Sequence, residues 1–428
     1  MNIIEKIGCE VYRLKSANDL NPLLDRTGDA HCVMLGEASH GTHEYYTWRA
    51  AITKRLIQEK GFNFIAVEGD WPDCYRLNRF IKGHADQDKS ADQLLHGFNR
   101  WPTWMWANWE IDALLNWLKA YNSEQPLNWR VGFYGLDVYS LWESIEALID
   151  YLKVNDPKTA ELAKQAIHCF EPYSEDPREY AKAQIYLDAS CRNEVVTLLS
   201  EIRKKAPVYD HDPEAALNSE QNAQIAVNAE EYYSKMVGFN DNTWNLRDGH
   251  MMDTLNRIYQ FYGKGSKGII WEHNTHIGDA RYTDMHRHGM YNTGQLAREQ
   301  YSEQDTVLVG FGSYSGTVMA GNQWGAQMKV MNMPEARPGS WEQELHNESA
   351  DNRLMIFDRD ADIQEKQVPH RAIGVVYHPE SERHSNYIPT VINRRYDAFI
   401  YLDQTRALHA LHLKPDGHLV PETYPFNF

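Results

Sequence analysis

Residues 31–68 read HCVMLGEASHGTHEYYTWRAAITKRLIQEKGFNFIAVE, and this stretch decides the fold because a strand, a helix and a second strand follow one another within it. Two short apolar runs flank a longer segment with helical spacing, which is the pattern of an α/β protein with parallel strands. Each apolar run ends in ionisable residues, the first at Glu37 and His40 and the second at Glu68. Ligands of open α/β sheets bind at the carboxyl ends of the strands. We therefore take Glu37, His40 and Glu68 as candidates for a functional site.

The predicted helix carries an arginine on its apolar face. Tyr45, Arg49, Ile52 and Leu56 are spaced by four, three and four residues, so they share one stripe of a helix. A charged side chain on a core-facing stripe requires a partner. Arg49 is therefore expected to pair with a carboxylate or to stabilise negative charge that develops during a reaction.

The same change from apolar to ionisable residues recurs twice. Two later runs that we predict as strands lead into Asp137 and into the pair His273 and His276. A capped loop, with Ser39 or Thr42 as the helix N-cap, would explain any single polar strand end without a function. The recurrence along the chain favours a shared site.

The rest of the chain alternates between strand and helix patterns. Further strand-like runs occur at 306–311, 354–357, 372–376 and 398–402. Residues 156–239 lack strand patterns and carry helical ones, which predicts an α-helical insertion or lid. We therefore predict an α/β fold with a mixed, largely parallel central sheet flanked by helices. Its catalytic core would comprise residues 1–155 and 240–428.

The charge composition indicates which kinds of partner the protein can bind. The 428 residues include 43 Lys and Arg against 60 Asp and Glu, for a formal net charge of −17, and they contain no basic run. Nucleic-acid binding depends on basic patches, so we expect no nucleic-acid partner. A small-molecule substrate, neutral or cationic, fits better, and the oligomeric state is left open.

Cysteine use and hydropathy suggest a compartment. The five cysteines are widely spaced and form no CxxC motif, which is typical of reduced thiols in a cytoplasmic protein. No apolar run approaches the roughly 18 residues that a membrane span requires. We therefore expect a cytoplasmic protein without membrane contact.

The candidate residues allow acid/base chemistry. A histidine is a suitable general base for activating water, and a carboxylate on its second ring nitrogen holds the required tautomer. His40 would be that base, Glu37 or Glu68 the carboxylate, and a second histidine would protonate the leaving group. No cofactor is required by this interpretation.

A divalent metal of the zinc or manganese type is the alternative. His273 and His276 have HxxH spacing, and with His40 and Glu68 they could ligate such an ion. A serine nucleophile is not expected, because the chain contains no GxSxG motif.

Several long blocks resemble a known family. They are GEASHGTHEYYTWR, AVEGDWPDCYRLNRF, FNRWPTWMWANWE, WNLRDGHMMDTL, WEHNTHIGDAR and IGVVYHPESERHSNYIPTVINRRYDAFIYLDQT. Over nearly its whole length the chain resembles the erythromycin esterase family. It is more similar to the bacterial succinoglycan-biosynthesis-like homologues than to the resistance esterases that open macrolide lactones.

The resemblance implies a mixed α/β core with a deep cleft and a mechanism of hydrolysis. The histidine of the GExSH motif, His40, would deprotonate water for attack on an ester carbonyl. The family motifs also map onto Glu37, Arg49, Glu68, His273 and His276. Second-tier candidates are His43, Asp137, Arg247 and Asp248.

Three functions follow as hypotheses. The leading one is a hydrolase that cleaves a carboxylic ester or lactone with water activated by a histidine. The second is a metal-dependent hydrolase or transferase acting on a glycan or a peptide. The third is a non-catalytic homologue that binds a small molecule.

Overall fold

The chain divides into two compact units. The computed structural model describes residues 7–173, 177–187, 190–205, 214–236, 243–358 and 366–411. The first unit, here called the sheet unit, comprises Met1–Ala66, Leu77–Phe133 and Gly265–Phe428. The second, here called the helical unit, comprises Val67–Arg76 and Tyr134–Lys264.

Most of the strands form one sheet of nine strands in the order β1-β8-β11-β6-β2-β5-β3-β4, with β7 paired to β6. The strands are β1 (Cys9–Arg13), β2 (Cys32–Leu35), β3 (Phe64–Asp70), β4 (Gly132–Asp137), β5 (Gly268–Trp271), β6 (Thr306–Ala320), β7 (Lys329–Met333), β8 (Arg353–Phe357), β9 (Val368–Arg371), β10 (Tyr387–Thr390) and β11 (Ala398–Thr405). β9 and β10 form a separate two-stranded sheet.

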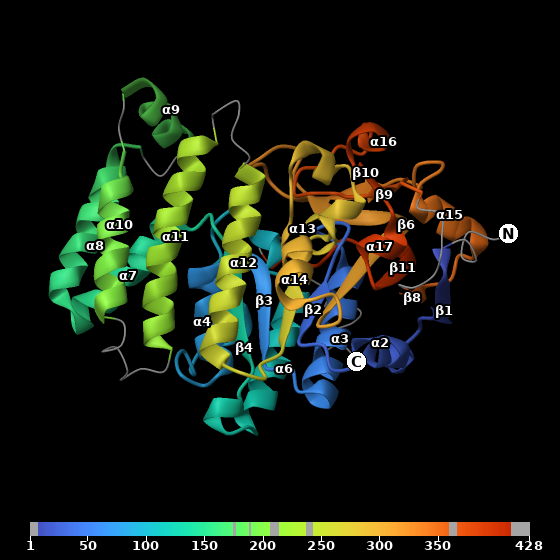
Figure 1. Cartoon of the computed structure of the whole chain (residues 1–428), viewed down its shortest axis with the longest axis horizontal. Helices are drawn as coiled ribbons and strands as arrows, with labels where there is room; N and C mark the ends of the chain where they lie inside the picture. The colour runs from blue at the N-terminus through green and yellow to red at the C-terminus, as the bar shows by residue number, and fades with distance from the viewer. Residues whose placement is uncertain are drawn as a thin grey trace. The chain divides into compact units, whose positions relative to one another are not determined.

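The helices lie between these strands in the sequence, as an α/β pattern requires (Figure 1). They are α2 (Asn21–Thr27), α3 (His43–Lys60), α4 (Trp71–Ile81), α5 (Ala91–Leu95), α6 (Trp109–Ser123), α7 (Leu141–Asn155), α8 (Pro157–Phe170), α9 (Pro177–Leu187), α10 (Arg192–Lys205), α11 (Ala215–Lys235), α12 (Thr243–Tyr262), α13 (Asn274–Ile277), α14 (Thr293–Tyr301), α15 (Trp341–Glu348), α16 (Glu382–Ser385) and α17 (Ile392–Arg395).

The sheet is mixed and largely parallel, which confirms the predicted fold class. β2 lies between β5 and β6 and is parallel to both, and β6 is parallel to β11. Every residue of β2 is buried, which explains its uninterrupted apolar sequence, since parallel strands are covered on both faces. β8 and β7 run antiparallel to their neighbours, so the change of direction occurs in the second half of the chain.

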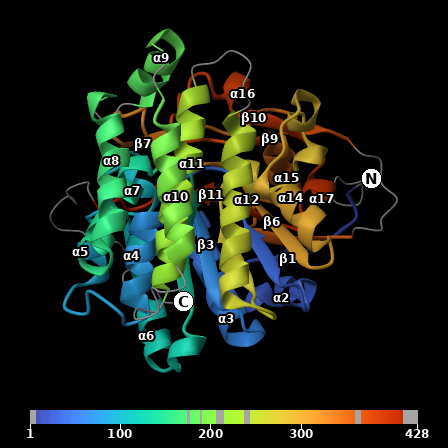
Figure 2. The ribbon, with the colours of Figure 1, turned by 60° about the vertical axis from the view of Figure 1, so that its left-hand side comes forward.

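Four helices of the helical unit pack around their own apolar core. α7, α8, α10 and α11 are neighbours in Figure 1, and the turned view in Figure 2 shows α11 beside α12. The core includes Leu148, Phe170, Leu198 and Ala226, all buried. Most of the described residues between 156 and 239 are thus helical, and their role as an insertion or lid stays a prediction.

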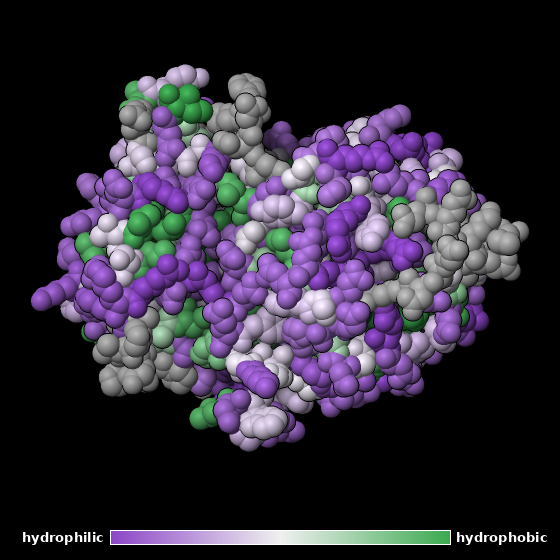
Figure 3. Space-filling view, viewed as in Figure 1, coloured by the Kyte–Doolittle hydropathy of each residue, from purple (hydrophilic) through white to green (hydrophobic). Residues whose placement is uncertain are grey.

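The face drawn in Figure 3 is predominantly polar. On the face drawn in Figure 3, hydrophilic residues cover most of the area, and the hydrophobic ones form separate small patches. Within the described residues, none of the helices combines the length and the hydropathy needed to cross a bilayer.

Two strand predictions are wrong in extent. The strand predicted at 306–311 is longer than expected, because β6 continues to Ala320 and pairs there with β7. The predicted strand at 372–376 is not formed, and β9 ends before it at Arg371. The continuation of β6 also pairs with β11, and the N–H of Ile373 donates to Ala38 O, so distant partners and not local hydropathy define these segments.

The prediction of five reduced thiols is also wrong. Cys169 at the end of α8 and Cys191 before α10 form a disulfide, with their Cα atoms 5.8 Å apart. The two residues are 22 positions apart, and α9 lies between them. Only the return of the chain around α9 brings them within bridging distance. Cys9, Cys32 and Cys74 are free thiols.

A buried histidine in the helical unit makes stability depend on pH. The Asn228 amide donates to His250 Nδ1 over 2.7 Å, and the ring is buried. Burial lowers the pKa of His250 from 6.5 to about 4, because it outweighs the opposing effect of Asp137, and Arg257 makes a smaller contribution in the same direction as burial. The imidazole therefore stays neutral in the folded protein at pH values where the unfolded chain is protonated.

We expect the protein to lose stability on acidification because His250 is buried in its neutral form. Below the unfolded pKa near 6.5, the unfolded chain binds a proton that the folded chain does not, so stability falls until the pH reaches the folded pKa. The loss amounts to about 3 kcal/mol at about pH 4. Urea unfolding of His250→Gln between about pH 7.5 and 4 should show a shallower decline than that of the natural protein. The control is His168→Gln at an exposed histidine, which should lose stability as steeply as the natural protein does. Equal slopes for His250→Gln and the natural protein would contradict the assignment to His250.

Candidate functional site

The loop between β2 and α3 is held by backbone contacts with distant segments. Asn274 donates its amide N–H to Glu37 O over 2.8 Å, and Met319 donates to Gly41 O over 2.9 Å. A Cβ atom on Gly41 would lie 1.9 Å from Met319 O, so only glycine allows this approach. The loop that carries Glu37 and His40 is therefore fixed by β6 and by α13.

A buried chain of three charged or ionisable side chains lies in this loop and in α3. His40 Nδ1 is 2.9 Å from Glu37 Oε1, and Arg49 Nη2 donates to Glu37 Oε2. The Arg49 guanidinium lies 4.5 Å from the ring centroid of Tyr46 and 4.6 Å from that of Trp271. All three side chains are buried, and Arg49 is fully so. The expected pairing of Arg49 with a carboxylate is thus present in the structure.

This hydrogen bond decides which nitrogen of His40 can accept a proton. A carboxylate only accepts hydrogen bonds, so Glu37 requires the ring proton on Nδ1 of a neutral His40. Nε2 then carries a lone pair. Of the two carboxylates considered for orienting His40, Glu37 is the one bonded to it.

His273 has the opposite tautomer. It is the N-cap of α13, where the backbone N–H of Thr275 donates to His273 Nδ1 over 3.2 Å. Nδ1 must therefore accept, which leaves the proton of a neutral His273 on Nε2. The ring centroids of His40 and His273 lie 4.9 Å apart. His40 can therefore accept a proton at its Nε2, and the neighbouring His273 can donate one from its Nε2.

The other residue of the HxxH pair, His276, is buried in α13 one turn after the N-cap His273. The parallel pairing of β2 with β5 brings Leu35 opposite Trp271, which explains why the segments after both strands meet. The sheet unit thus joins the strand ends that supply Glu37, His40 and His273.

The helical unit contains a second ionic cluster of predicted residues. Arg247 Nη2 donates to Glu68 Oε1 over 2.7 Å and to Asp137 Oδ2 over 2.6 Å. The guanidinium also lies 4.9 Å from the ring centroid of Tyr139. Glu68 lies within β3, which continues to Asp70, so the prediction that the strand ends before Glu68 is wrong. Asp248, next to Arg247, is buried in α12.

Sequence reasoning missed a third cluster, which joins His43 to two residues that we had not considered. His43 Nδ1 lies 2.6 Å from Glu110 Oε1, and His409 Nδ1 lies 2.8 Å from the same oxygen. Burial raises the pKa of Glu110, but the hydrogen bonds from His409 and His43 outweigh burial and lower it to about 2. Among the residues that the structure describes, these three are the one group whose ligand atoms lie close enough to hold a metal ion.

Asn108 positions Glu110 by capping α6. Its side-chain oxygen accepts the N–H of Ile111 over 2.8 Å, and its amide donates to Trp104 O and Met105 O. Asn followed by acidic residues is a local helix-start pattern, which could have indicated Glu110 from the sequence. No local pattern indicates His409.

We expect Asn108→Ala to cost about 1–2 kcal/mol of stability, because the N–H of Ile111 and Trp104 O lose the Asn108 side chain as a partner, whereas Met105 O still accepts from the Tyr46 hydroxyl. Thermal and urea unfolding would measure this loss. Asn116→Ala, on the same helix with a single amide bond to Asp112, serves as the control and should cost less. An equal cost for both variants would show that the cap contributes little.

Comparisons with known proteins cover most of the chain. The family model described as erythromycin esterase matches residues 57–405. Over 368 residues the chain is 22% identical to the erythromycin esterase type II of Escherichia coli, covering 79% of this chain and 84% of that protein. It is 21% identical over 393 residues to the putative hydrolase YbfO of Bacillus subtilis (strain 168), covering 87% and 83%.

Solved structures share the fold. A succinoglycan biosynthesis protein superposes with a TM-score of 0.72 at 20% identity, covering 95% of this chain and 98% of the other. A mutant of the erythromycin esterase EreC in its open conformation superposes with a TM-score of 0.68 at 16% identity, covering 93% and 98%. This chain belongs to the erythromycin esterase family, and that membership supports a hydrolase function.

Proposed function

We propose that this protein hydrolyses a carboxylic ester or lactone, with His40 as the general base. The observation that carries the proposal is the 2.9 Å hydrogen bond between His40 Nδ1 and Glu37. It leaves Nε2 of His40 able to take a proton from water, and the carboxylate stabilises the imidazolium that results. The names of the relatives, an erythromycin esterase and a putative hydrolase, agree with this chemistry.

The proposed reaction needs no covalent intermediate on the protein. Water loses a proton to His40 Nε2 while its oxygen adds to the carbonyl carbon. The carbonyl oxygen becomes an oxyanion, for which the Nε2–H of His273 is the proposed donor. The C–O bond to the alcohol then breaks, and the proton held by His40 passes to the leaving oxygen.

Arg49 acts through Glu37 in this proposal. Its guanidinium donates to Oε2 of Glu37 and so holds the carboxylate with Oε1 toward His40, because both side chains are buried and satisfy each other. Glu68 and His276 stay predictions from the sequence as site residues. Cofactors are not required by the proposed chemistry, and the natural substrate is an ester or lactone of unspecified structure.

A panel of esters and lactones tests the proposal. It should include chromogenic aryl esters, simple lactones and a macrolide lactone, each measured with the purified protein before and after chelator treatment. We expect turnover of at least one carboxylic ester or lactone that the chelator does not abolish. Turnover that disappears with the chelator and returns with metal would instead support the metal-dependent hydrolase.

A further inference from the structure

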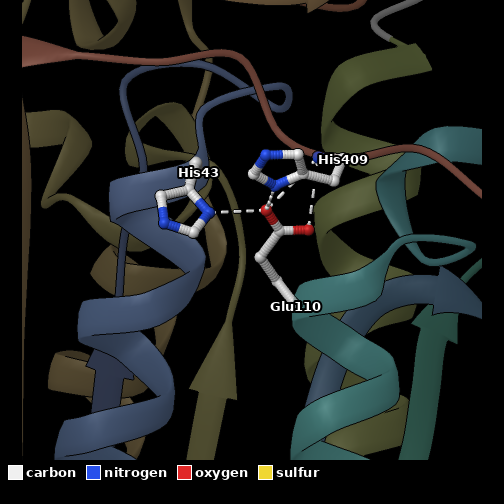
Figure 4. A group of neighbouring side chains, drawn as sticks. All are labelled: His43, Glu110 and His409. Atoms are coloured by element: carbon white, nitrogen blue, oxygen red, sulfur yellow. Dashed lines mark hydrogen bonds and ion pairs between the residues drawn. The ribbon is translucent and has the colours of Figure 1, made fainter. Parts of the chain in front are cut away.

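His43, Glu110 and His409 bring two imidazole nitrogens to one carboxylate oxygen. Figure 4 shows both rings turned toward Glu110, with His43 at the start of α3 and Glu110 in the first turn of α6. His409 comes from the segment that follows β11. The Nδ1 atoms of His43 and His409 lie 2.6 and 2.8 Å from Glu110 Oε1, and the two ring centroids are 5.1 Å apart.

We propose that these three side chains bind one divalent cation of the zinc type. Two imidazole nitrogens and a carboxylate oxygen are a donor set that zinc accepts, with a fourth position left for water. The proposal concerns a site separate from the His40–Glu37 pair and does not rest on the proposed hydrolase function.

The geometry requires a small opening of the cluster. Ligand atoms around a tetrahedral zinc ion at about 2.0–2.1 Å lie about 3.3 Å from one another. The present Nδ1 to Oε1 distances of 2.6 and 2.8 Å are shorter because hydrogen bonds now join the atoms. On binding, each ring carries its proton on Nε2 and turns its Nδ1 lone pair to the ion, so small side-chain rotations suffice.

The backbone already holds the three residues in place. His409 O accepts the N–H of Trp109 over 3.0 Å, and the N–H of Leu411 donates to Ala107 O over 3.0 Å. The N–H of Leu408 donates over 3.0 Å to Gly41 O, just before α3. Because these bonds fix the segments that carry the ligands, the ion need not order a loop in order to bind.

The burial of the three residues is also compatible with binding a cation. The side chains of His43 and Glu110 are buried, whereas that of His409 is 35% exposed. A cation can therefore reach the cluster from the side of His409, where water can supply the fourth ligand. A bound ion would link α3, α6 and the segment after β11, because each of them supplies one ligand.

The test uses the full chain stripped of metal by chelation and dialysis. Zn²⁺ is titrated by calorimetry, and Co²⁺ is titrated by its visible absorption, which reports four-coordinate geometry. We expect one ion per chain, an intense tetrahedral Co²⁺ spectrum and a higher unfolding temperature with Zn²⁺. Absence of stoichiometric binding would show a hydrogen-bonded cluster without a metal role and would overturn the proposal.

Three variants localise the ion. His409→Asn is the main one, because its partly exposed side chain can be replaced without a core cavity, and Glu110→Gln removes the shared carboxylate. We expect affinity to fall at least about 100-fold in His409→Asn, since loss of a group that only orients a ligand already costs about 10–100-fold. His346→Asn removes another imidazole bonded to a carboxylate, Asp403 at 2.7 Å, and should keep full affinity.

A further control addresses adventitious binding. The exposed pair His286 and His288 could bind Zn²⁺ weakly, so the double variant His286→Asn/His288→Asn is titrated beside the others. Full affinity in this variant together with loss in His409→Asn supports the proposed site. The reverse result would assign the ion to the exposed pair and overturn the proposal.

Discussion

Replacing His40 with asparagine should lower kcat/KM for any ester that the protein hydrolyses by about 10²–10⁴-fold, the usual contribution of a positioned general base. Asparagine keeps much of the shape and can still bond to Glu37, but it has no basic nitrogen at the place of Nε2. The unfolding temperature should change little, because the asparagine amide can keep the hydrogen bond to Glu37. Steady-state kinetics and thermal unfolding of the same preparations would measure both effects.

His168 offers a matched control for that experiment. It lies three residues before Glu171, and its Nδ1 is 2.6 Å from Glu171 Oε2, so it repeats the local pairing of His40 with Glu37 between two exposed side chains. His168→Asn should retain full activity. Full activity in His40→Asn would rule out His40 as the base, whatever the substrate.

Replacing Arg49 with methionine should destabilise the protein by about 3–5 kcal/mol, because it leaves the charge of Glu37 buried without its cation. Methionine approximates the length of the arginine stem, so the result reports mainly the lost charge. The variant also loses the contacts of the guanidinium with the rings of Tyr46 and Trp271. Denaturant unfolding would measure the change in the free energy of unfolding.

A second substitution separates lost charge from lost packing. In the double variant Glu37→Gln/Arg49→Met the buried anion is absent, so part of the lost stability should return. Arg55→Met removes a surface ion pair with Glu59 from the same helix and should cost at most about 1 kcal/mol. If Arg49→Met costs no more than Arg55→Met, the buried pair does not stabilise the fold.

The sequence was sufficient for the α/β fold and for the residues that surround His40, because the patterns that identify them are local. A buried parallel strand is apolar throughout, and a polar turn must follow it, so the loop after β2 and the apolar stripe of α3 can be recognised within about forty residues. Glu37, His40 and Arg49 all belong to that stretch. Their mutual hydrogen bonds confirm the predicted pairing of Arg49 with a carboxylate.

Contacts between distant segments were decided only by the folded chain. Glu110 and His409 meet His43 because three separate segments pack together, and no spacing in the sequence encodes that meeting. The continuation of β6 beyond Phe311 depends in part on its pairing with the distant β11, and the Cys169–Cys191 bridge depends on the path around α9. Local hydropathy reflects whether a residue is buried, whereas its neighbours across the core depend on how all the elements pack.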